Sequence, residues 1–147
     1  MWVRIPYFQN ITTNCPYSYV SNHYNLLVSK KHRFKRITFN NSTIQIVKTL
    51  YRSGVITNFI IIKNSIKSSN QLSIKFTVLF YKNSPFFKKI KLISTPSKQF
   101  FITKSALKLS QKVFKTSLII ISTNKGLLTH QEADALGLGG KVVYIVN

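Results

Sequence analysis

Residues 122–146 have the sequence STNKGLLTHQEADALGLGGKVVYIV, and the order of features in this stretch decides the fold. Thr129 and Glu132 have the spacing of a capping box, in which each side chain pairs with a free backbone N–H at a helix start. Gly137 stands where a left-handed glycine commonly ends a helix. We therefore predict a polar loop, a short helix over 129–136 and a final strand.

A double glycine, Gly139-Gly140, precedes the predicted strand over 141–146. A dinucleotide-binding phosphate loop follows a strand and opens a helix. Here the glycines follow a helix and precede a strand, which is the reverse order. They predict a tight entry into the last strand rather than a phosphate site.

Both acidic residues of the 147-residue chain, Glu132 and Asp134, fall in this stretch, against 22 lysines and arginines. With a net charge of +20 the isolated chain repels itself, and a polyanion is the simplest partner that neutralises it. We expect nucleic acid rather than an anionic membrane surface, because the best amphipathic helix is short and only modestly basic. No apolar run approaches the ~18 residues of a transmembrane helix.

The two acids do not predict a catalytic pair. Two positions apart on a helix, they lie about 200° apart around its axis. No other carboxylate completes an acid–base pair or a Mg²⁺ site, and the three histidines lack the spacing of a metal site. The lone Cys15 allows neither an internal disulfide nor a cysteine-based metal site. We therefore expect that the protein is not an enzyme and that it binds neither a cofactor nor a metal ion.

A nucleophilic arrangement of Ser122, His130 and Asp134 is the remaining catalytic alternative, and nothing local favours it. The capping box already explains Glu132, whose charge also lies at the positive end of the helix dipole. The sequence indicates no role for Asp134 beyond pairing with a lysine or facing solvent.

The first half of the sequence has patterns that predict two helices followed by a sheet. Apolar residues recur at helical spacing over 43–53, after an N-cap at Asn41 or Ser42 and before a terminating Gly54. Residues 72–80 alternate as a half-buried strand does. We also predict a short basic helix over 23–33, a strand over 55–63, and a third strand of the same sheet over 87–93.

The second half begins at a turn around Pro96. We predict a short strand over 99–103, a mostly irregular segment with one helical turn over 105–117, and a buried strand over 118–122. The fold class is α+β with two small domains: two helices on a three-stranded sheet, then a mostly β domain with one short helix. The predicted divisions are an N-terminal extension (1–22), an N-terminal domain (23–93) and a C-terminal domain (94–147).

Three co-linear segments resemble one known family. Ser-Thr-Asn-Lys-Gly, the capped helix and Gly-Leu-Gly-Gly before the last strand resemble the C-terminal signature of the eighth small-subunit ribosomal protein in its bacterial-type form. STPSKQFFI (94–102) and LYRSGVITNFII (50–61) resemble two further segments of that family, in the same order and spacing. The resemblance covers residues 23–147, and residues 1–22 look additional.

The resemblance implies an RNA-binding protein that binds the central domain of small-subunit rRNA early in assembly, next to other small-subunit proteins and without forming a homo-oligomer. Family members contact RNA through the Ser/Thr loop, the segment near the proline and the polar start of the second helix. Carried over by position, the RNA-binding residues are Ser122, Thr123, Asn124, Lys125, Gln99, Phe101, Asn41 and Ser42.

Several positions depart from the family pattern. Lys141 stands where many relatives carry an RNA-facing glutamate, and we expect it to contact a phosphate instead. Asn124 replaces a serine but still donates and accepts hydrogen bonds. The other departures are Ser97 for glycine, Gln99 for arginine and Phe101 for tyrosine, and weaker RNA candidates are Lys88, Lys89 and Lys91.

The composition indicates an organelle. Residue types with AT-rich codons are abundant, and there are 18 lysines but only 4 arginines. Residues 1–10 show neither a secretory core nor the pattern of a transit peptide, so we expect synthesis inside the organelle. We predict a structural protein of an organellar small ribosomal subunit, in the mitochondrion or, as the alternative, the plastid. A basic RNA-processing nuclease is the rival from the enzyme class, and it would need the carboxylates or histidine pair that this chain lacks.

Overall fold

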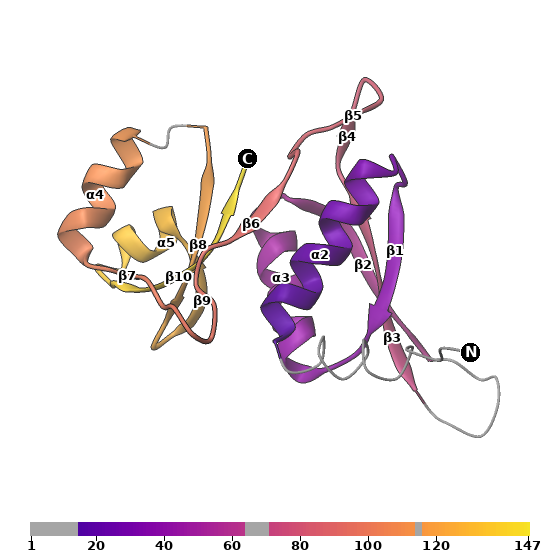
Figure 1. Ribbon diagram of the computed structural model, residues 1–147, viewed down its shortest axis with the longest axis horizontal. Helices are drawn as coiled ribbons and strands as arrows, with labels where there is room; N and C mark the ends of the chain where they lie inside the picture. The colour runs from indigo at the N-terminus through magenta and orange to yellow at the C-terminus, as the bar shows by residue number, and fades with distance from the viewer. Residues whose placement is uncertain (1–14, 64–70, 114–115) are drawn as a thin grey trace.

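The described residues form a three-stranded sheet, a five-stranded sheet and a two-stranded hairpin, and the helices pack on the two larger sheets (Figure 1). The computed structural model describes residues 15–63, 71–113 and 116–147. Most of the predicted extension (1–14) and the turn after the first long strand (64–70) therefore lie outside the described residues. The fold class is the predicted α+β arrangement, and the division into domains at residues 23 and 94 stays a prediction.

The first half places helices α2 and α3 on one face of an antiparallel sheet with the order β1-β3-β2. Ile37 of β1 pairs with Ile74 of β3, and both side chains are buried beneath the helices. The elements are α2 (Pro16–Ser29), β1 (Phe34–Thr38), α3 (Asn41–Arg52), β2 (Ile56–Lys63) and β3 (Leu72–Val78), followed by a small hairpin of β4 (Phe80–Tyr81) and β5 (Ser84–Pro85).

The third strand of this sheet was predicted wrongly. It is β1, which precedes α3, whereas the segment predicted over 87–93 supplies β6 (Ile90–Leu92) to the other sheet. Only Ile37 of β1 is buried, and Lys35 and Arg36 precede it, so no alternating apolar pattern predicts a strand at these residues. The alternation over 87–93 predicted a strand correctly, but a strand pattern does not identify the partner strand.

The helix boundaries also differ from the predictions. Helix α2 begins at Pro16, seven residues before the predicted start, and buries Val20, Tyr24 and Leu27. It ends before the basic residues, where Lys31 adopts a φ of 54°. The N-cap of α3 is Asn40, one residue before the predicted candidates, and its backbone N–H donates to the Thr43 hydroxyl over 2.8 Å.

The second half is a sheet with the order β6-β10-β8-β9, in which β7 also pairs with β10. Helices α4 and α5 contact each other, and their small core contains Leu107 and Ala133 together with Ile121 of β8. The elements are β7 (Phe101–Ile102), α4 (Lys104–Val113), β8 (Leu118–Thr123), β9 (Gly126–Thr129), α5 (His130–Ala135) and β10 (Gly140–Val146).

Helix α4 is longer than the single turn predicted for this segment. Leu107 is its one buried residue, and the small or polar Ala106, Ser110 and Gln111 are half-buried beside it. The packing of α4 on α5 accounts for the additional helical turns. Within the described ranges, no helix combines the length and apolarity needed to cross a membrane.

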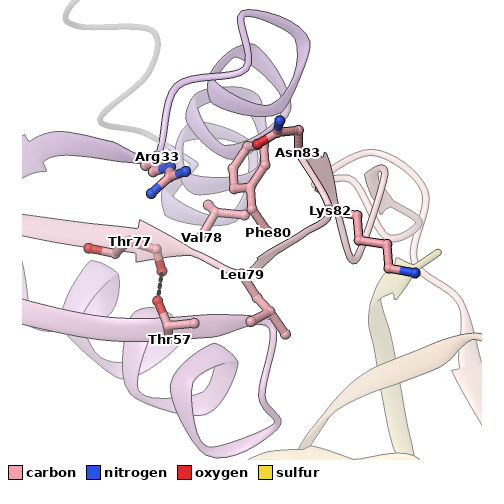
Figure 2. A pocket seen from close by; sticks show the side chains of 8 residues that line it. All are labelled: Arg33, Thr57, Thr77, Val78, Leu79, Phe80, Lys82 and Asn83. Carbon is pink, nitrogen blue, oxygen red and sulfur yellow. Dashed lines mark hydrogen bonds between the residues drawn. The ribbon is translucent and has the colours of Figure 1, made fainter.

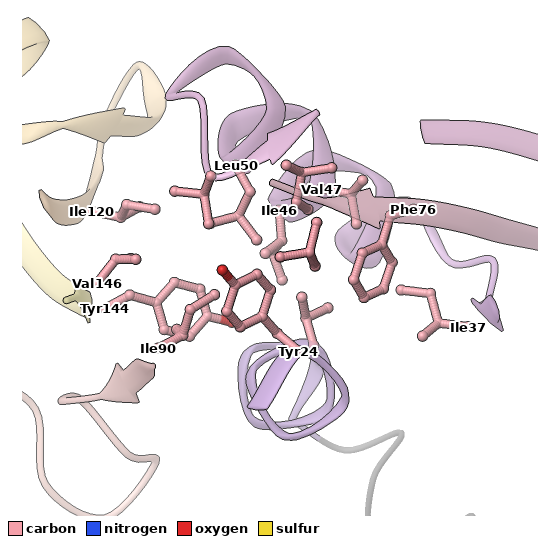
Figure 3. Close-up of a cluster of buried hydrophobic side chains, with 14 of the residues drawn as sticks. Tyr24, Ile37, Ile46, Val47, Leu50, Phe76, Ile90, Ile120, Tyr144 and Val146 are labelled. Carbon is pink, nitrogen blue, oxygen red and sulfur yellow. The ribbon is translucent and has the colours of Figure 1, made fainter. Parts of the chain in front are cut away.

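One hydrophobic core joins the two halves (Figure 3). Tyr24 of α2 and Leu50 of α3 meet Ile120, Tyr144 and Val146 of the second sheet, and all five are at most 1% exposed. At the β8–β10 pairing the register shifts between Val142 and Tyr144, which is a β-bulge. Because the bulge adds one residue, Val143 and Tyr144 both belong to this core.

The Asn25 side chain closes the free edge of β6. Its Nδ2 donates to the Ile90 carbonyl and its Oδ1 accepts from the Ile90 N–H, both over 2.9 Å. The amide therefore takes the place of a neighbouring strand on a residue that is 1% exposed. These two bonds couple α2 to the second sheet.

We expect Asn25→Ala to leave the buried Ile90 backbone groups unpaired and to lower the free energy of unfolding by about 2 kcal/mol. Urea unfolding measures this, with Asn22→Ala as the matched control because Asn22 lies on the same helix and is exposed. Equal stability of the two variants would contradict the role of Asn25.

Candidate nucleic-acid interface

Three of the predicted RNA-binding residues form one row across the second sheet. Lys141 of β10 pairs with Phe101 of β7 on one side and with Ser122 of β8 on the other. Directly paired residues of antiparallel strands point to the same face. The structure thus brings together three side chains from separate predicted segments, and we call them the Phe101–Lys141–Ser122 row.

The row lies on the sheet face that packs on the first half. Ser122 follows Ile120 by two positions, so both side chains point to this face, and Ile120 belongs to the shared core. Phe101 is 73% exposed, whereas Lys141 and Ser122 are half-buried. The row is therefore a continuation of the core face beyond the part that the first half covers.

A tight hairpin extends the row at Ser122. Thr123 pairs with Gly126, which leaves Asn124 and Lys125 exposed at the tip. The Thr123 hydroxyl donates to the Gly126 carbonyl over 2.9 Å and accepts from the Lys125 N–H over 3.2 Å. Among the described residues nothing pairs with the Ser122 hydroxyl. Thr123 thus holds the loop, whereas Ser122 and Asn124 are available to a partner.

Ser94 positions Phe101 beside Lys141. Its side chain is buried, and its hydroxyl donates to the Val142 carbonyl and accepts from the Phe100 N–H over 3.0 Å. Backbone hydrogen bonds between Thr95 and Lys98 close the turn that separates Ser94 from Phe100. Neither central residue of this turn, Pro96 or Ser97, has a left-handed φ, so serine replaces the family's glycine without strain. Gln99 lies exposed just before the row.

The double glycine permits this close pairing. A Cβ on Gly139 would lie 2.6 Å from the Ile102 carbonyl oxygen, and one on Gly140 would collide with the Ser122 carbonyl oxygen. Gly137 has a φ of 66° immediately after α5. The predicted helix end and tight strand entry are confirmed, and the reason for the second is the closeness of β7 and β8 on either side of β10.

Asn41 and Ser42 are not part of the row. They are exposed in the first turn of α3, whereas the other end of α3 contacts β9. At ~1.5 Å per residue, Asn41 lies about 16 Å along the helix from Arg52. The three predicted contact regions therefore divide into one assembled site and one separate helix start.

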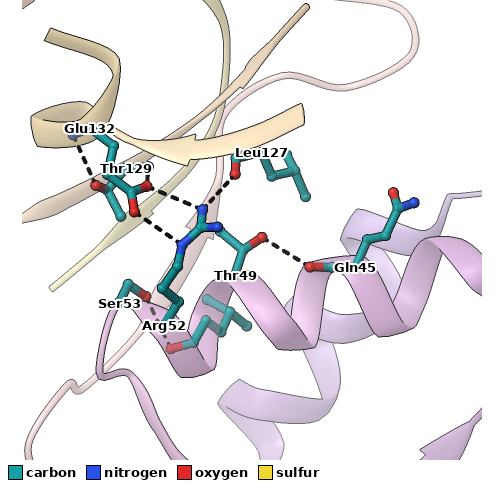
Figure 4. A network of polar contacts seen from close by, with 8 residues as sticks. Gln45, Thr49, Arg52, Ser53, Leu127, Thr129 and Glu132 are labelled. Carbon is teal, nitrogen blue, oxygen red and sulfur yellow. Dashed lines mark hydrogen bonds and ion pairs between the residues drawn. The ribbon is translucent and has the colours of Figure 1, made fainter. Parts of the chain in front are cut away.

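Arg52 fixes the position of the second sheet against α3 (Figure 4). Its Nε lies 3.0 Å from Glu132 Oε1, and its Nη2 donates to the Leu127 carbonyl over 3.0 Å. Glu132 also accepts from the Thr129 N–H over 2.9 Å, and Thr129 in turn accepts from the Glu132 N–H, so the predicted capping box is confirmed. The helical pattern puts Arg52 on a polar face, but nothing in the sequence identifies its partner.

A sequence model of the family described as Ribosomal protein S8 matches residues 23–147. The match covers the row, the hairpin and the start of α3. The chain belongs to the ribosomal protein S8 family.

Similar proteins include members from a protist and from bacteria. The chain is 28% identical over 104 residues to small ribosomal subunit protein uS8m of Acanthamoeba castellanii, covering 71% of this chain and 76% of that protein. It is 30% identical over 108 residues to uS8 of Nitratiruptor sp., covering 74% and 79%. It is 31% identical over 101 residues to uS8 of Buchnera aphidicola, covering 69% and 72%.

Membership of the ribosomal protein S8 family confirms that this chain is a structural protein and not an enzyme. The His130 Nδ1 accepts the Ile119 N–H over 3.2 Å instead of facing Ser122, and Asp134 accepts from Gln111 over 3.3 Å. In residues 15–63, 71–113 and 116–147 no three metal-ligating side chains gather. The other Asp134 oxygen is buried without a donor among the described residues.

The burial of His130 predicts that the stability of the fold depends on pH. It is 6% exposed, and burial lowers the pKa of its imidazole below the ordinary value of 6.5. Burial likewise lowers the pKa of His23, with the Lys35 charge as a smaller cause. Because the folded chain disfavours the charged imidazoles, the unfolded chain binds more protons once the pH falls below about 6.5.

The free energy of unfolding should therefore decrease as the pH falls from about 7.5 to about 5.5, and this decrease should be smaller in His130→Gln. Urea unfolding at several pH values measures it. His32→Gln, at an exposed position, is the control and should follow the wild type. The same pH dependence in His130→Gln and the wild type would contradict this role.

Proposed function

We propose that this protein is a structural constituent of a mitochondrial small ribosomal subunit, where it binds the central domain of the small-subunit rRNA and supports assembly. The observation that carries the proposal is the Phe101–Lys141–Ser122 row next to the Asn124–Lys125 hairpin tip. These residues come from separate predicted segments and lie together on one surface, whereas Asn41 and Ser42 lie apart from them.

The chemistry of this surface suits structured RNA. Ser122 and Asn124 offer short polar groups that can approach a 2′-OH or a base edge, and the exposed Phe101 ring offers a stacking face. Lys125 and Lys141 supply phosphate contacts. Glu132 does not oppose them, because its charge is paired with Arg52.

The remaining contacts belong to the same proposal. Gln99 lies just before Phe101 and is exposed, while Asn41 and Ser42 present polar groups at the start of α3. We assign all three to the RNA interface, with the α3 start contacting a different part of the RNA from the row. Neighbouring small-subunit proteins are the other partners, and the chain acts as a monomer within the subunit.

The mitochondrial assignment rests on two independent observations. The AT-biased composition favours an organellar genome. One of the similar proteins is the uS8m of Acanthamoeba castellanii, whose name marks it as mitochondrial. Bacterial uS8 proteins are equally similar, as expected for an organellar ribosome of bacterial type.

Ser122→Ala combined with Thr123→Ala should weaken binding to central-domain rRNA about tenfold, since each lost hydrogen bond contributes roughly 0.5–1.5 kcal/mol. Binding to an unrelated RNA of the same length should change much less. Filter binding or fluorescence anisotropy measures both affinities.

The control for that experiment is Ser105→Ala with Thr116→Ala, which removes two exposed hydroxyls elsewhere. Ser122→Ala alone tests the contact while keeping the Thr123 bonds that hold the loop. An equal loss on cognate and unrelated RNA would refute the specific loop contact.

Gradient sedimentation tests the assignment to the mitochondrion. The tagged protein, followed in fractionated cells of the source organism, should sediment with mitochondrial small subunits and should shift to the top of the gradient when the ribosomes are dissociated and the rRNA digested. Sedimentation with plastid or cytosolic subunits would overturn this assignment without affecting the family.

A further inference from the structure

A cavity lies at the end of the first sheet, where β3 leaves the sheet for the β4–β5 hairpin (Figure 2). Its volume is about 380 Å³, within the size range of small-molecule pockets. Arg33, Thr57, Thr77, Phe80 and Asn83 are among the residues that line it. The cavity is on the half of the molecule that does not carry the Phe101–Lys141–Ser122 row.

The hairpin turn aims a polar group at this cavity. Lys82 and Asn83 have φ values of 48° and 62°, which two-residue turns joining β-strands require. Figure 2 shows Arg33 and Asn83 on either side of the Phe80 ring, whereas the Lys82 ammonium points away from Arg33. The Thr57 hydroxyl donates to the Thr77 carbonyl over 3.0 Å and so joins β2 to β3 beside the opening. The cavity thus combines one guanidinium, one amide and an aromatic ring.

The cavity continues onto the face of the first sheet that lies opposite helices α2 and α3. Thr77 pairs with Phe34, and the neighbouring pair on this face is Arg36 with Lys75. Phe34 is 56% exposed, and the Lys75 ammonium lies 4.1 Å from its ring centroid. Helices α2 and α3 pack on the other face, where Ile37 and Ile74 are buried. The Phe34 ring and Arg36 are therefore exposed next to the opening, and the half-buried Lys75 lies against that ring.

The distribution of arginine favours RNA as the occupant. Arginine binds phosphate with a rigid fork that lysine lacks. The chain has 4 arginines among 22 basic residues, and two of them, Arg33 and Arg36, lie at this cavity and face. Both carboxylates of the chain are in the second half, so no acidic residue opposes a polyanion here.

We propose that the cavity and the adjoining face of Phe34, Arg36 and Lys75 form a second RNA-binding surface for an unpaired nucleotide. Arg33 and Arg36 contact phosphates, and the cavity takes the base, with the Asn83 amide facing its edge and Phe80 against its ring. This inference rests on the proposed rRNA-binding function and adds a separate contact region to it.

Arg33→Gln combined with Arg36→Gln tests the surface in the full chain. We expect this variant to bind small-subunit rRNA about tenfold more weakly. Because it loses two phosphate contacts, the slope of log affinity against log salt should become less steep by about 1.4–1.8. The Arg33 carbonyl, which accepts from the Val78 N–H, is unchanged by the substitution.

Two further variants separate the cavity from general charge. Lys108→Gln with Lys112→Gln removes the same charge from exposed positions of α4, and we expect the wild-type salt slope there. Asn83→Gly removes the amide but tolerates the positive φ, and it should weaken binding about threefold without changing the slope.

Three outcomes would refute the proposal or its basis. If the slope of log affinity against log salt is the same for the arginine variant and the α4 control, the proposal of a second surface is wrong. Normal rRNA binding with failure to enter small subunits would assign this face to a protein partner and also overturn it. Failure of the proposed function looks different: the wild type then shows no preference for small-subunit rRNA over unrelated RNA.

Discussion

Strand β10 is the element on which the rest of the structure depends. It pairs with β8 on one edge and with β6 and β7 on the other. Its first residues carry Lys141 into the row, while Tyr144 and Val146 form part of the core shared with the first half. The β-bulge lies between these two parts of β10, and because of it the side chains of Val143 and Tyr144 both enter the shared core. One seven-residue strand therefore carries both a member of the proposed RNA-binding row and part of the contact between the halves.

Because the chain has only two acidic side chains, few ion pairs contribute to its stability. Glu132 caps α5, accepts from Thr129 and pairs with Arg52, so one carboxylate serves both local and long-range structure. The pair is partly exposed, and such pairs contribute at most about 1 kcal/mol. The shared apolar core and the Asn25–Ile90 bonds carry most of the coupling between halves. The excess positive charge is left for a polyanionic partner to neutralise.

Local patterns predicted most elements of the fold correctly. The capping box at Thr129, the glycine ends of α3 and α5 and the alternation of β3 depend on interactions within a few residues, which the sequence contains directly. The errors have a common cause. The sequence predicts β6 in the wrong sheet, a start of α2 that is seven residues too late and only one turn of α4. Each of these features depends on packing against residues that are distant in the chain.

The candidate site divides in the same way. The residue types and the family resemblance predicted that Ser122, Lys141 and Phe101 contact RNA, because the motifs that carry them are contiguous in sequence. Their union in one row required the pairing of β7, β10 and β8. The sequence by itself determined the α+β class, the capped helix and the absence of a catalytic pair, and its charge predicted a polyanionic partner. Only the tertiary structure decided which strands share a sheet, what Arg52 and Asn25 hold, and that Arg33 lines a cavity, since these depend on contacts between residues far apart in the chain.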